Sequence, residues 1–292
     1  MSSLNNKEEI NQSSIACIFV LYHPEPSSLN KLDRFAEFGY PVIVVINAIA
    51  HHALEILQSK RHLHVINNPN NIGLASALNQ GIKYAFDRLN TQFVVLFDQD
   101  SEPLSELPMQ LVSEFMAHGS DLACIGPMLT DVKIQGAQYL AQNKASVQTI
   151  PTSGTLISQA AFAKVGRMMD ALFIDGIDHE WCFRAAHIGL RIAVSNKVLM
   201  SHNMGDDGLN WLGQYKPVYR NPIRHFYIIR NSIYLVKLPY IPLSWRLIES
   251  LKIIRRIVMY LWASNDRSRS LRLIFKAVLD GFSSHLGPLN EG

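Results

Sequence analysis

The sequence predicts an α/β protein with a mostly parallel sheet and helices on both faces, followed by a C-terminal extension of basic amphipathic helices. Two observations predict the sheet. Runs of strand length, such as Ile15–Leu21 and residues 92–97, are apolar throughout, and helix-like segments separate them. Strands that are apolar at every position are buried on both faces, which is typical of parallel sheets. The third observation, an excess of Lys and Arg late in the chain, predicts the extension.

The first hundred residues supply most of this sheet. Residues 1–14 are polar and lack the apolar core of a secretory signal, so we expect an N-terminal tail there. A helix is expected from a cap at Ser27 or Ser28 through Phe38, and the helical spacing of apolar residues predicts another over 72–89. Apolar runs predict four strands, at Ile15–Leu21, 41–46, 62–66 and 92–97.

The middle of the chain is mixed. Residues 122–125 and 155–157 are expected to form short strands. Residues 178–189 are expected to form a helix that is capped by Asp178 and ended by Gly189. No internal repeat or low-complexity tract interrupts the sequence.

The C-terminal extension differs from the rest in composition. Prolines punctuate the chain from residue 211 onward, before amphipathic stretches at 243–262 and 268–282. Residues 216–276 hold 13 Lys and Arg but two acids, a local charge of +11 in a chain whose net charge is +3. We therefore expect a domain at 15–210, an extension at 211–292, and a polyanionic partner, either nucleic acid or anionic lipid, near the extension.

Composition excludes several classes of protein. A chain of 292 residues that is 48% hydrophobic and 17% charged can bury a sizeable core, which excludes disorder, collagen and coiled coil. Cys17, Cys124 and Cys182 are far apart, which excludes a disulfide framework or zinc ribbon and fits a reducing compartment. The chain has no run of about 18 uncharged apolar residues, so a simple membrane-spanning helix is not expected.

An acidic pair directly follows the fourth predicted strand. Asp98 and Asp100 lie on a turn at the carboxyl edge of the sheet, where ligands of such sheets bind. Two carboxylates at this spacing can share one divalent cation and its bound diphosphate, and Mg²⁺ or Mn²⁺ prefers such oxygen ligands. The alternative is a solvated acidic turn.

Asp175, Asp178 and Glu180 form a second acidic cluster. A helix start that faces the first cluster would supply a carboxylate general base. Alternatively, Asp178 only caps the helix and Glu180 only favours its dipole. His202 is a candidate metal ligand through a neutral ring nitrogen, and a structural or surface histidine is the alternative.

Asn and Gly residues precede the helix predicted over 72–89. The loop amides and helix N-terminus could face phosphate or sugar hydroxyl groups, and ordinary turn chemistry is the alternative. The chain lacks both G-x-x-x-x-G-K-[ST] and G-x-G-x-x-G, so a P-loop or dinucleotide fingerprint is excluded. It also lacks G-x-S-x-G, which argues against a serine hydrolase.

Six motifs occur in a fixed order over most of the chain. They are N-x-G-L-A-x-A-L-N-x-G at 71–81, F-D-Q-D-S at 97–101, T-S-G-T-L-I at 152–157, F-I-D-x-x-D-x-E-W-C-x-R-A at 173–185, H-x-x-G at 202–205 and R-x-x-Y-x-x-R-N at 224–231. Together they resemble glycosyltransferase family 2, the inverting enzymes of the GT-A nucleotide-sugar-binding fold. The forms D-Q-D-S and D-x-E-W resemble the bacterial rhamnosyltransferases that use dTDP-L-rhamnose.

This resemblance implies roles for individual residues. Asp98 would lie near the ribose or donor sugar, and Asp100 would hold Mg²⁺ or Mn²⁺ on the diphosphate. His202 would be a further contact of the metal or diphosphate, and Asp178 would be the catalytic base. The nucleotide pocket would be bordered by Tyr22, Pro24, Asn47, Asn71 and Gly73. The acceptor side would be formed by Gly154, Glu180, Trp181 and Arg184.

One position departs from the family pattern. Ile46 stands where the family commonly has an acidic residue that hydrogen-bonds the pyrimidine base. A different nucleotide-sugar donor therefore stays open. The mechanism that the resemblance implies is one in-line displacement, in which Asp178 accepts the proton of an acceptor hydroxyl. The acceptor would be a lipid-linked saccharide or a growing cell-surface polysaccharide such as O-antigen, at the cytoplasmic face of the bacterial inner membrane.

The basic extension has three interpretations. Its helices combine an apolar face, basic flanks and a Trp, which suits an anionic membrane surface and a peripheral location. They could instead pack on the domain or on a second subunit as a homodimer. Nucleic-acid binding is not expected, because no recognised binding motif is present. A non-catalytic membrane adaptor is a further alternative, against which Asp98, Asp100, Asp178 and His202 argue.

Overall fold

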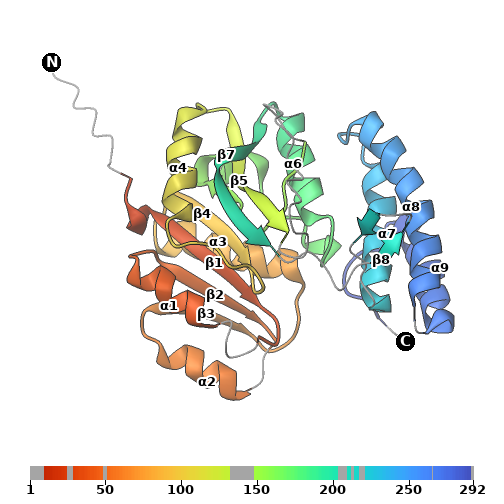
Figure 1. Ribbon diagram of the computed structural model, residues 1–292, viewed down its shortest axis with the longest axis horizontal. Helices are drawn as coiled ribbons and strands as arrows, with labels where there is room; N and C mark the ends of the chain where they lie inside the picture. Colours follow the sequence, from red (N-terminus) through yellow and green to blue (C-terminus); the bar gives the residue numbers. More distant parts are fainter. Residues whose placement is uncertain are drawn as a thin grey trace.

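The computed structural model describes residues 10–24, 29–48, 51–131, 148–202, 209–211, 214–216, 221–264 and 266–290. Within these residues the main sheet has seven strands in the order β3-β2-β1-β4-β6-β5-β7 (Figure 1). All pairings are parallel except those of β6, which runs antiparallel to β4 and β5. The strands are β1 (Ile15–Leu21), β2 (Val42–Asn47), β3 (Leu63–Asn68), β4 (Phe93–Asp98), β5 (Leu122–Asp131), β6 (Leu156–Ser158) and β7 (Arg191–His202).

Helices cover both faces of the sheet, which confirms the predicted α/β class. One face packs against α1 (Asn30–Glu37), α2 (His51–Ser59) and α4 (Leu107–Ala117). The other packs against α3 (Leu74–Arg88), α5 (Gln159–Val165) and α6 (Ile177–His187). The chain also forms short 3₁₀ turns, η1 (Gln12–Ser14) and η3 (Asp170–Leu172), and a small hairpin of β8 (Leu209–Trp211) and β9 (Gln214–Lys216).

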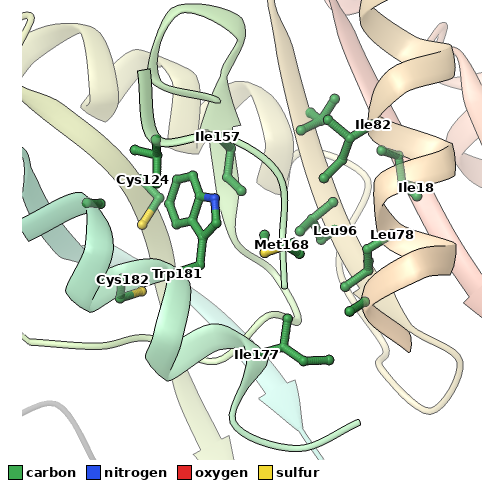
Figure 2. Packing of buried hydrophobic residues seen from close by; sticks show 14 of the residues in the cluster. Ile18, Leu78, Ile82, Leu96, Cys124, Ile157, Met168, Ile177, Trp181 and Cys182 are labelled. Atoms are coloured by element: carbon green, nitrogen blue, oxygen red, sulfur yellow. The ribbon is translucent and has the colours of Figure 1, made fainter. Parts of the chain in front are cut away.

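Two apolar cores lie on opposite faces of the sheet. All seven residues of β1 are buried, and alternate side chains enter alternate cores, as strand geometry requires. Figure 2 shows one core, in which the indole of Trp181 from α6 lies beside Cys124, Ile157 and Met168. All three cysteines are buried and free, in agreement with the absence of a predicted disulfide framework.

The extension forms three helices, α7 (Pro222–Lys237), α8 (Leu243–Ala263) and α9 (Arg267–Ser283), which stand beside the sheet domain (Figure 1). They share a third apolar core. The tail after α9 returns to the domain, because Gly287 N donates to Ala171 O at 2.7 Å. Arg230 of α7 donates to the carbonyl oxygens of both Gly287 and Leu172, so the helices are bound to the segment that precedes α6.

Three predicted details differ from the structure or lie outside it. The predicted cap Asp178 lies inside the first turn of α6, because Gly176, in the left-handed conformation, is the N-cap. Ser27 and Ser28 lie outside the described residues. The domain boundary predicted between residues 210 and 211 falls inside β8. None of the described helices combines the length and the apolar character that a membrane crossing requires.

Candidate active site

A cleft of about 1050 Å³ opens at the carboxyl edge of the sheet. One wall consists of the ends of β1, β2 and β4, including Tyr22, Asn47 and the Asp98–Asp100 turn. The opposite wall consists of residues from α7 and α8, and the segment 173–179 that leads into α6 lies between the two walls. The cleft therefore lies between the sheet domain and the extension, and both contribute polar groups to it.

A buried lysine donates hydrogen bonds to the backbone of the turn that carries Asp98 and Asp100. Lys31 of α1 is 2% exposed, and its Nζ donates to the carbonyl oxygens of Gln99 at 2.5 Å and Ser101 at 2.7 Å. Burial lowers the pKa of Lys31, and the carboxylates of Glu102 and Asp100 oppose this effect. This buried ammonium fixes the backbone of the turn and places a positive charge near Asp100.

The two carboxylates of the turn differ in environment. Asp100 is exposed in the cleft, whereas Asp98 is half-buried at the end of β4. Burial, followed by the negative charges of Asp100 and Asp178, raises the pKa of Asp98 to about 7. Asp178, from α6, lines the same cleft as the turn. The cleft thus holds three neighbouring carboxylates, those of Asp98, Asp100 and Asp178.

Two asparagines order the neighbouring edge of the cleft. Asn47 is 4% exposed, its Nδ2 donates to Asn71 Oδ1 at 2.9 Å, and its Oδ1 accepts from Ile72 N at 2.8 Å. Asn71 Oδ1 also accepts from Gly73 N at 2.9 Å. Both asparagine side chains face the cleft, but their mutual bonds show that they shape this loop.

Gly73 is required by its conformation and by its neighbour. It caps α3 at φ +87°, and an added Cβ would lie 2.7 Å from the ring of Phe173. Phe173 O accepts the backbone N–H of Leu74 at 2.6 Å, so the segment before α6 contacts the start of α3. Gly73 therefore supports the cleft wall without lining it.

The segment before α6 has an unusual backbone that α7 stabilises. Phe173, Asp175 and Gly176 all have positive φ, at 67°, 64° and 81°. Asn231 of α7 is 1% exposed, and its Nδ2 donates to the carbonyl oxygens of Leu172, Ile174 and Asp175. These bonds turn the chain so that Asp175 and Asp178 reach the cleft.

Asp175 and Asp178 have different partners. Asp175 Oδ1 pairs with Arg224 of α7 at 3.2 Å, while its buried Oδ2 has no hydrogen-bond partner among the described residues. Burial raises the pKa of Asp175, and Arg224 opposes this effect. Asp178 Oδ1 accepts from the N–H of His179 at 2.8 Å, and the carboxylate is 25% exposed in the cleft.

The far wall of the cleft is basic. Arg224, Tyr227 and Asn231 lie on one face of α7, and Arg255 and Arg256 extend from α8. Arg256 forms an ion pair with buried Glu249, which also pairs with Lys252. Burial opposes ionisation of Glu249, but Arg256 and Lys252 hold its pKa below the ordinary value.

The structure places Glu180, Trp181 and Arg184 in the scaffold and not along the cleft. Glu180 is 0% exposed, and its buried carboxylate accepts from Arg184, one turn along α6, and from the hydroxyl of Tyr240. Arg184 also donates to the carbonyl oxygens of Val165 and Arg167. Trp181 Nε1 donates to Gly166 O at 2.8 Å within the core. This network fixes the helix that carries Asp178.

The remaining predicted residues vary in their position. Tyr22 lines the cleft and is 49% exposed, whereas Pro24 lies outside the lining. Gly154, at φ +81°, packs behind the cleft against Pro127 and Met200. His202 ends β7 opposite Asp131, and its side chain lies outside the described residues. Among the side chains that the structure describes, no three His, Cys, Asp or Glu groups converge closely enough to hold a metal ion by themselves.

Sequence reasoning missed two groups of site residues. Lys31 bonds two backbone carbonyls far along the chain, and no local pattern marks it. The α7 residues lie inside the motif R-x-x-Y-x-x-R-N, whose helical spacing of Arg224, Tyr227 and Asn231 could have indicated a shared face.

The sequence is similar to those of known glycosyltransferases. Residues 29–155 match the model of the family described as glycosyl transferase family 2. The chain is 26% identical over 292 residues to the dTDP-rhamnosyl transferase RfbF of Shigella flexneri, with 94% of this chain and 97% of that protein covered. It is 23% identical over 240 residues to the low-salt glycan biosynthesis hexosyltransferase Agl10 of Haloferax volcanii, with 75% of this chain and 76% of that protein covered.

Solved structures share the fold. The crystal structure of S. aureus TarS 1-349 in complex with UDP-GlcNAc matches with a TM-score of 0.60 at 15% identity, over 92% of this chain and 81% of that chain. A longer TarS structure matches with a TM-score of 0.56 at 15% identity, over 83% of this chain and 43% of that chain. At this level of identity the likeness concerns the fold alone.

Proposed function

We propose that this chain is a member of glycosyltransferase family 2 that transfers L-rhamnose from dTDP-L-rhamnose to a hydroxyl group of a lipid-linked saccharide or a growing cell-surface polysaccharide. The rhamnosyl donor is supported by the similarity to RfbF, which extends over 94% of this chain. The volume of the cleft, about 1050 Å³, is sufficient for a nucleotide sugar together with part of an acceptor.

The observation that carries the proposal is that Asp178 lines the same cleft as the Asp98–Asp100 turn. It combines a candidate base on one element with a candidate diphosphate site on another. Asp178 would accept the proton of the acceptor hydroxyl while that oxygen attacks the anomeric carbon and the bond to the diphosphate breaks. A single displacement of this kind inverts the anomeric centre.

A divalent cation fits the donor side of the cleft. Asp98 and Asp100 would supply oxygen ligands, and phosphate oxygens and water would complete the shell, as Mg²⁺ or Mn²⁺ prefers. Burial and then the negative charges of Asp100 and Asp178 raise the pKa of Asp98, and a bound cation would offset the charge repulsion, which supports this fit. When bound, the cation would offset the charge that grows on the departing diphosphate.

The role of Asp178 is tested by Asp178→Asn, with Asp87→Asn as the matched control. Asp87 is an exposed carboxylate on α3 that pairs with Lys83 and lies outside the cleft. We expect Asp178→Asn to retain donor binding and to lose turnover by about 10²- to 10⁴-fold, the usual contribution of a positioned base. Near-normal turnover of Asp178→Asn would transfer the role of base to Asp175, its acidic neighbour in the cleft.

Ile46 favours a second candidate, the same reaction with another nucleotide-sugar donor. Its side chain is aliphatic and fully buried on β2. This position therefore offers no carboxylate to a pyrimidine base. A panel of dTDP- and UDP-linked sugars, with Mg²⁺ or Mn²⁺ and polyprenyl-linked acceptors, decides between the donors. Transfer from dTDP-L-rhamnose supports the proposal. Transfer only from another donor selects the second candidate. The absence of both transfer and donor hydrolysis favours a non-catalytic adaptor.

A further inference from the structure

The outer face of α8 is apolar over almost its full length. Leu247, Leu251, Ile254 and Val258 are between 58% and 70% exposed, and their spacing of four, three and four residues places them on one helical stripe. Leu243, Ile248 and Trp262 extend this stripe and are also more than half exposed. Contiguous apolar surface of this kind marks an interaction site.

The outer face of α9 combines an apolar stripe with a basic one. Leu271, Phe275 and Leu279 follow each other at four-residue spacing and are 58%, 65% and 53% exposed. Arg272 and Lys276 occupy the next positions around the helix and are also exposed. Both helices bury their opposite faces with α7 in one apolar core, so the two stripes point away from α7.

Positive charge dominates this surface. Each of the two helices contains one acid, Glu249 in α8 and Asp280 in α9. Glu249 is 3% exposed and neutralised by Arg256 and Lys252, and Asp280 pairs with Lys276 at 3.3 Å. The exposed charge beside the apolar stripes is therefore basic, which is complementary to phosphate headgroups above acyl chains.

We propose that the exposed α8–α9 face is a docking surface for an anionic lipid bilayer. The apolar stripes would enter the boundary between headgroups and acyl chains, and the Arg and Lys side chains would contact lipid phosphates. The same helix α8 contributes Arg255 and Arg256 to the cleft, so docking places the basic wall of the cleft close to the headgroups. The proposal extends the proposed function but does not depend on catalysis.

Flotation of the full chain with vesicles tests the docking surface directly. The vesicles are either phosphatidylcholine alone or phosphatidylcholine with about one third phosphatidylglycerol, at low and high salt. We expect binding to the anionic vesicles that weakens with salt, since screening reduces the attraction. Failure to float with anionic vesicles at low salt would overturn the proposal.

Two double variants separate the charged and apolar contributions. Arg272→Gln with Lys276→Gln is expected to weaken partitioning roughly 30-fold at low salt, from about fivefold for each charge near the surface. Its control is Arg61→Gln with Arg88→Gln, which removes two exposed charges from the sheet domain. Leu251→Gln with Ile254→Gln is expected to abolish flotation, whereas Leu104→Gln, at a 67% exposed leucine outside the extension, is expected to retain it.

Insertion is measured by an independent readout. Trp262 is 56% exposed on the outer stripe, so lipids brominated on the acyl chain should quench the tryptophan fluorescence of Trp262. This part of the quenching should be absent in Trp262→Phe. Identical quenching of both proteins would contradict the proposal.

Sedimentation without lipid tests whether another molecule occupies the face. A dimer that dissociates in the Leu251→Gln, Ile254→Gln variant would assign the face to a second copy and overturn the proposal. A nucleic-acid complex that needs Arg272 and Lys276, without flotation, would also overturn the proposal.

Discussion

Asp98→Asn is expected to stabilise the protein, and the gain should depend on pH. Burial and the charges of Asp100 and Asp178 raise the pKa of Asp98 from 3.8 to about 7. At about 1.4 kcal/mol for each pKa unit, ionised Asp98 destabilises the folded state by roughly 4 kcal/mol at most. The folded protein retains a proton that the unfolded chain has already lost, so stability falls as the pH rises from about 4 to about 7.

The variant removes this dependence because the amide side chain introduced by Asp98→Asn carries no charge at any of these pH values. Its advantage over the wild type should be small near pH 4, should grow by about 1.4 kcal/mol for each pH unit, and should level off above pH 7. Other titrating groups are present in both proteins, so their effects largely cancel in the difference.

Urea unfolding at pH 5 and pH 8, with a chelator present, measures this difference. We expect the advantage of Asp98→Asn to be roughly 3 kcal/mol larger at pH 8 than at pH 5. The control Asp87→Asn, at an exposed ion pair with Lys83, should change little between the two values of pH. Adding Mg²⁺ in place of the chelator should reduce the advantage, because a bound cation stabilises the wild type. An equal advantage at both values of pH would refute the electrostatic account.

Three other substitutions test the supports of the cleft. Lys31→Met removes the ammonium that holds Gln99 O and Ser101 O, so the KM for the donor should rise about tenfold in steady-state assays, while Lys31→Arg should retain most binding. Gly73→Ala forces a Cβ toward Phe173 at positive φ, and urea unfolding should show a loss of about 1–3 kcal/mol. Asn231→Leu leaves the carbonyl oxygens of Ile174 and Asp175 without their donor, and a loss of about 3 kcal/mol is expected in urea, against little change for exposed Asn196→Leu.

The sheet could be predicted from the sequence because its signal is local. In β1 every side chain is buried, and a strand buried on both faces must be apolar at every position. The turn after β4 could be located for the same reason, since Asp98 and Asp100 follow such a run directly. By contrast, α7 has polar residues facing the cleft and apolar residues facing a core, and its pattern did not distinguish it from a connecting segment.

Side-chain environment was harder to predict than position. The family resemblance implied that Glu180 contacts an acceptor, yet in the structure Arg184 pairs with its carboxylate and the Tyr240 hydroxyl donates to it in the interior. The Tyr240 contact lies 60 residues away in the chain, so no local pattern could reveal it. Lys31 presents the same difficulty, because its partners are backbone carbonyls, which every residue has.

The two walls of the cleft come from different stretches of the sequence. The family model ends at residue 155 and includes the Asp98–Asp100 turn, whereas the facing wall on α7 and α8 begins at residue 221. Mutations in the second stretch can therefore alter the shape and charge of one wall while the first is left unchanged. Such a division allows a lineage of these enzymes to diversify on one side of the cleft during evolution without rebuilding the other.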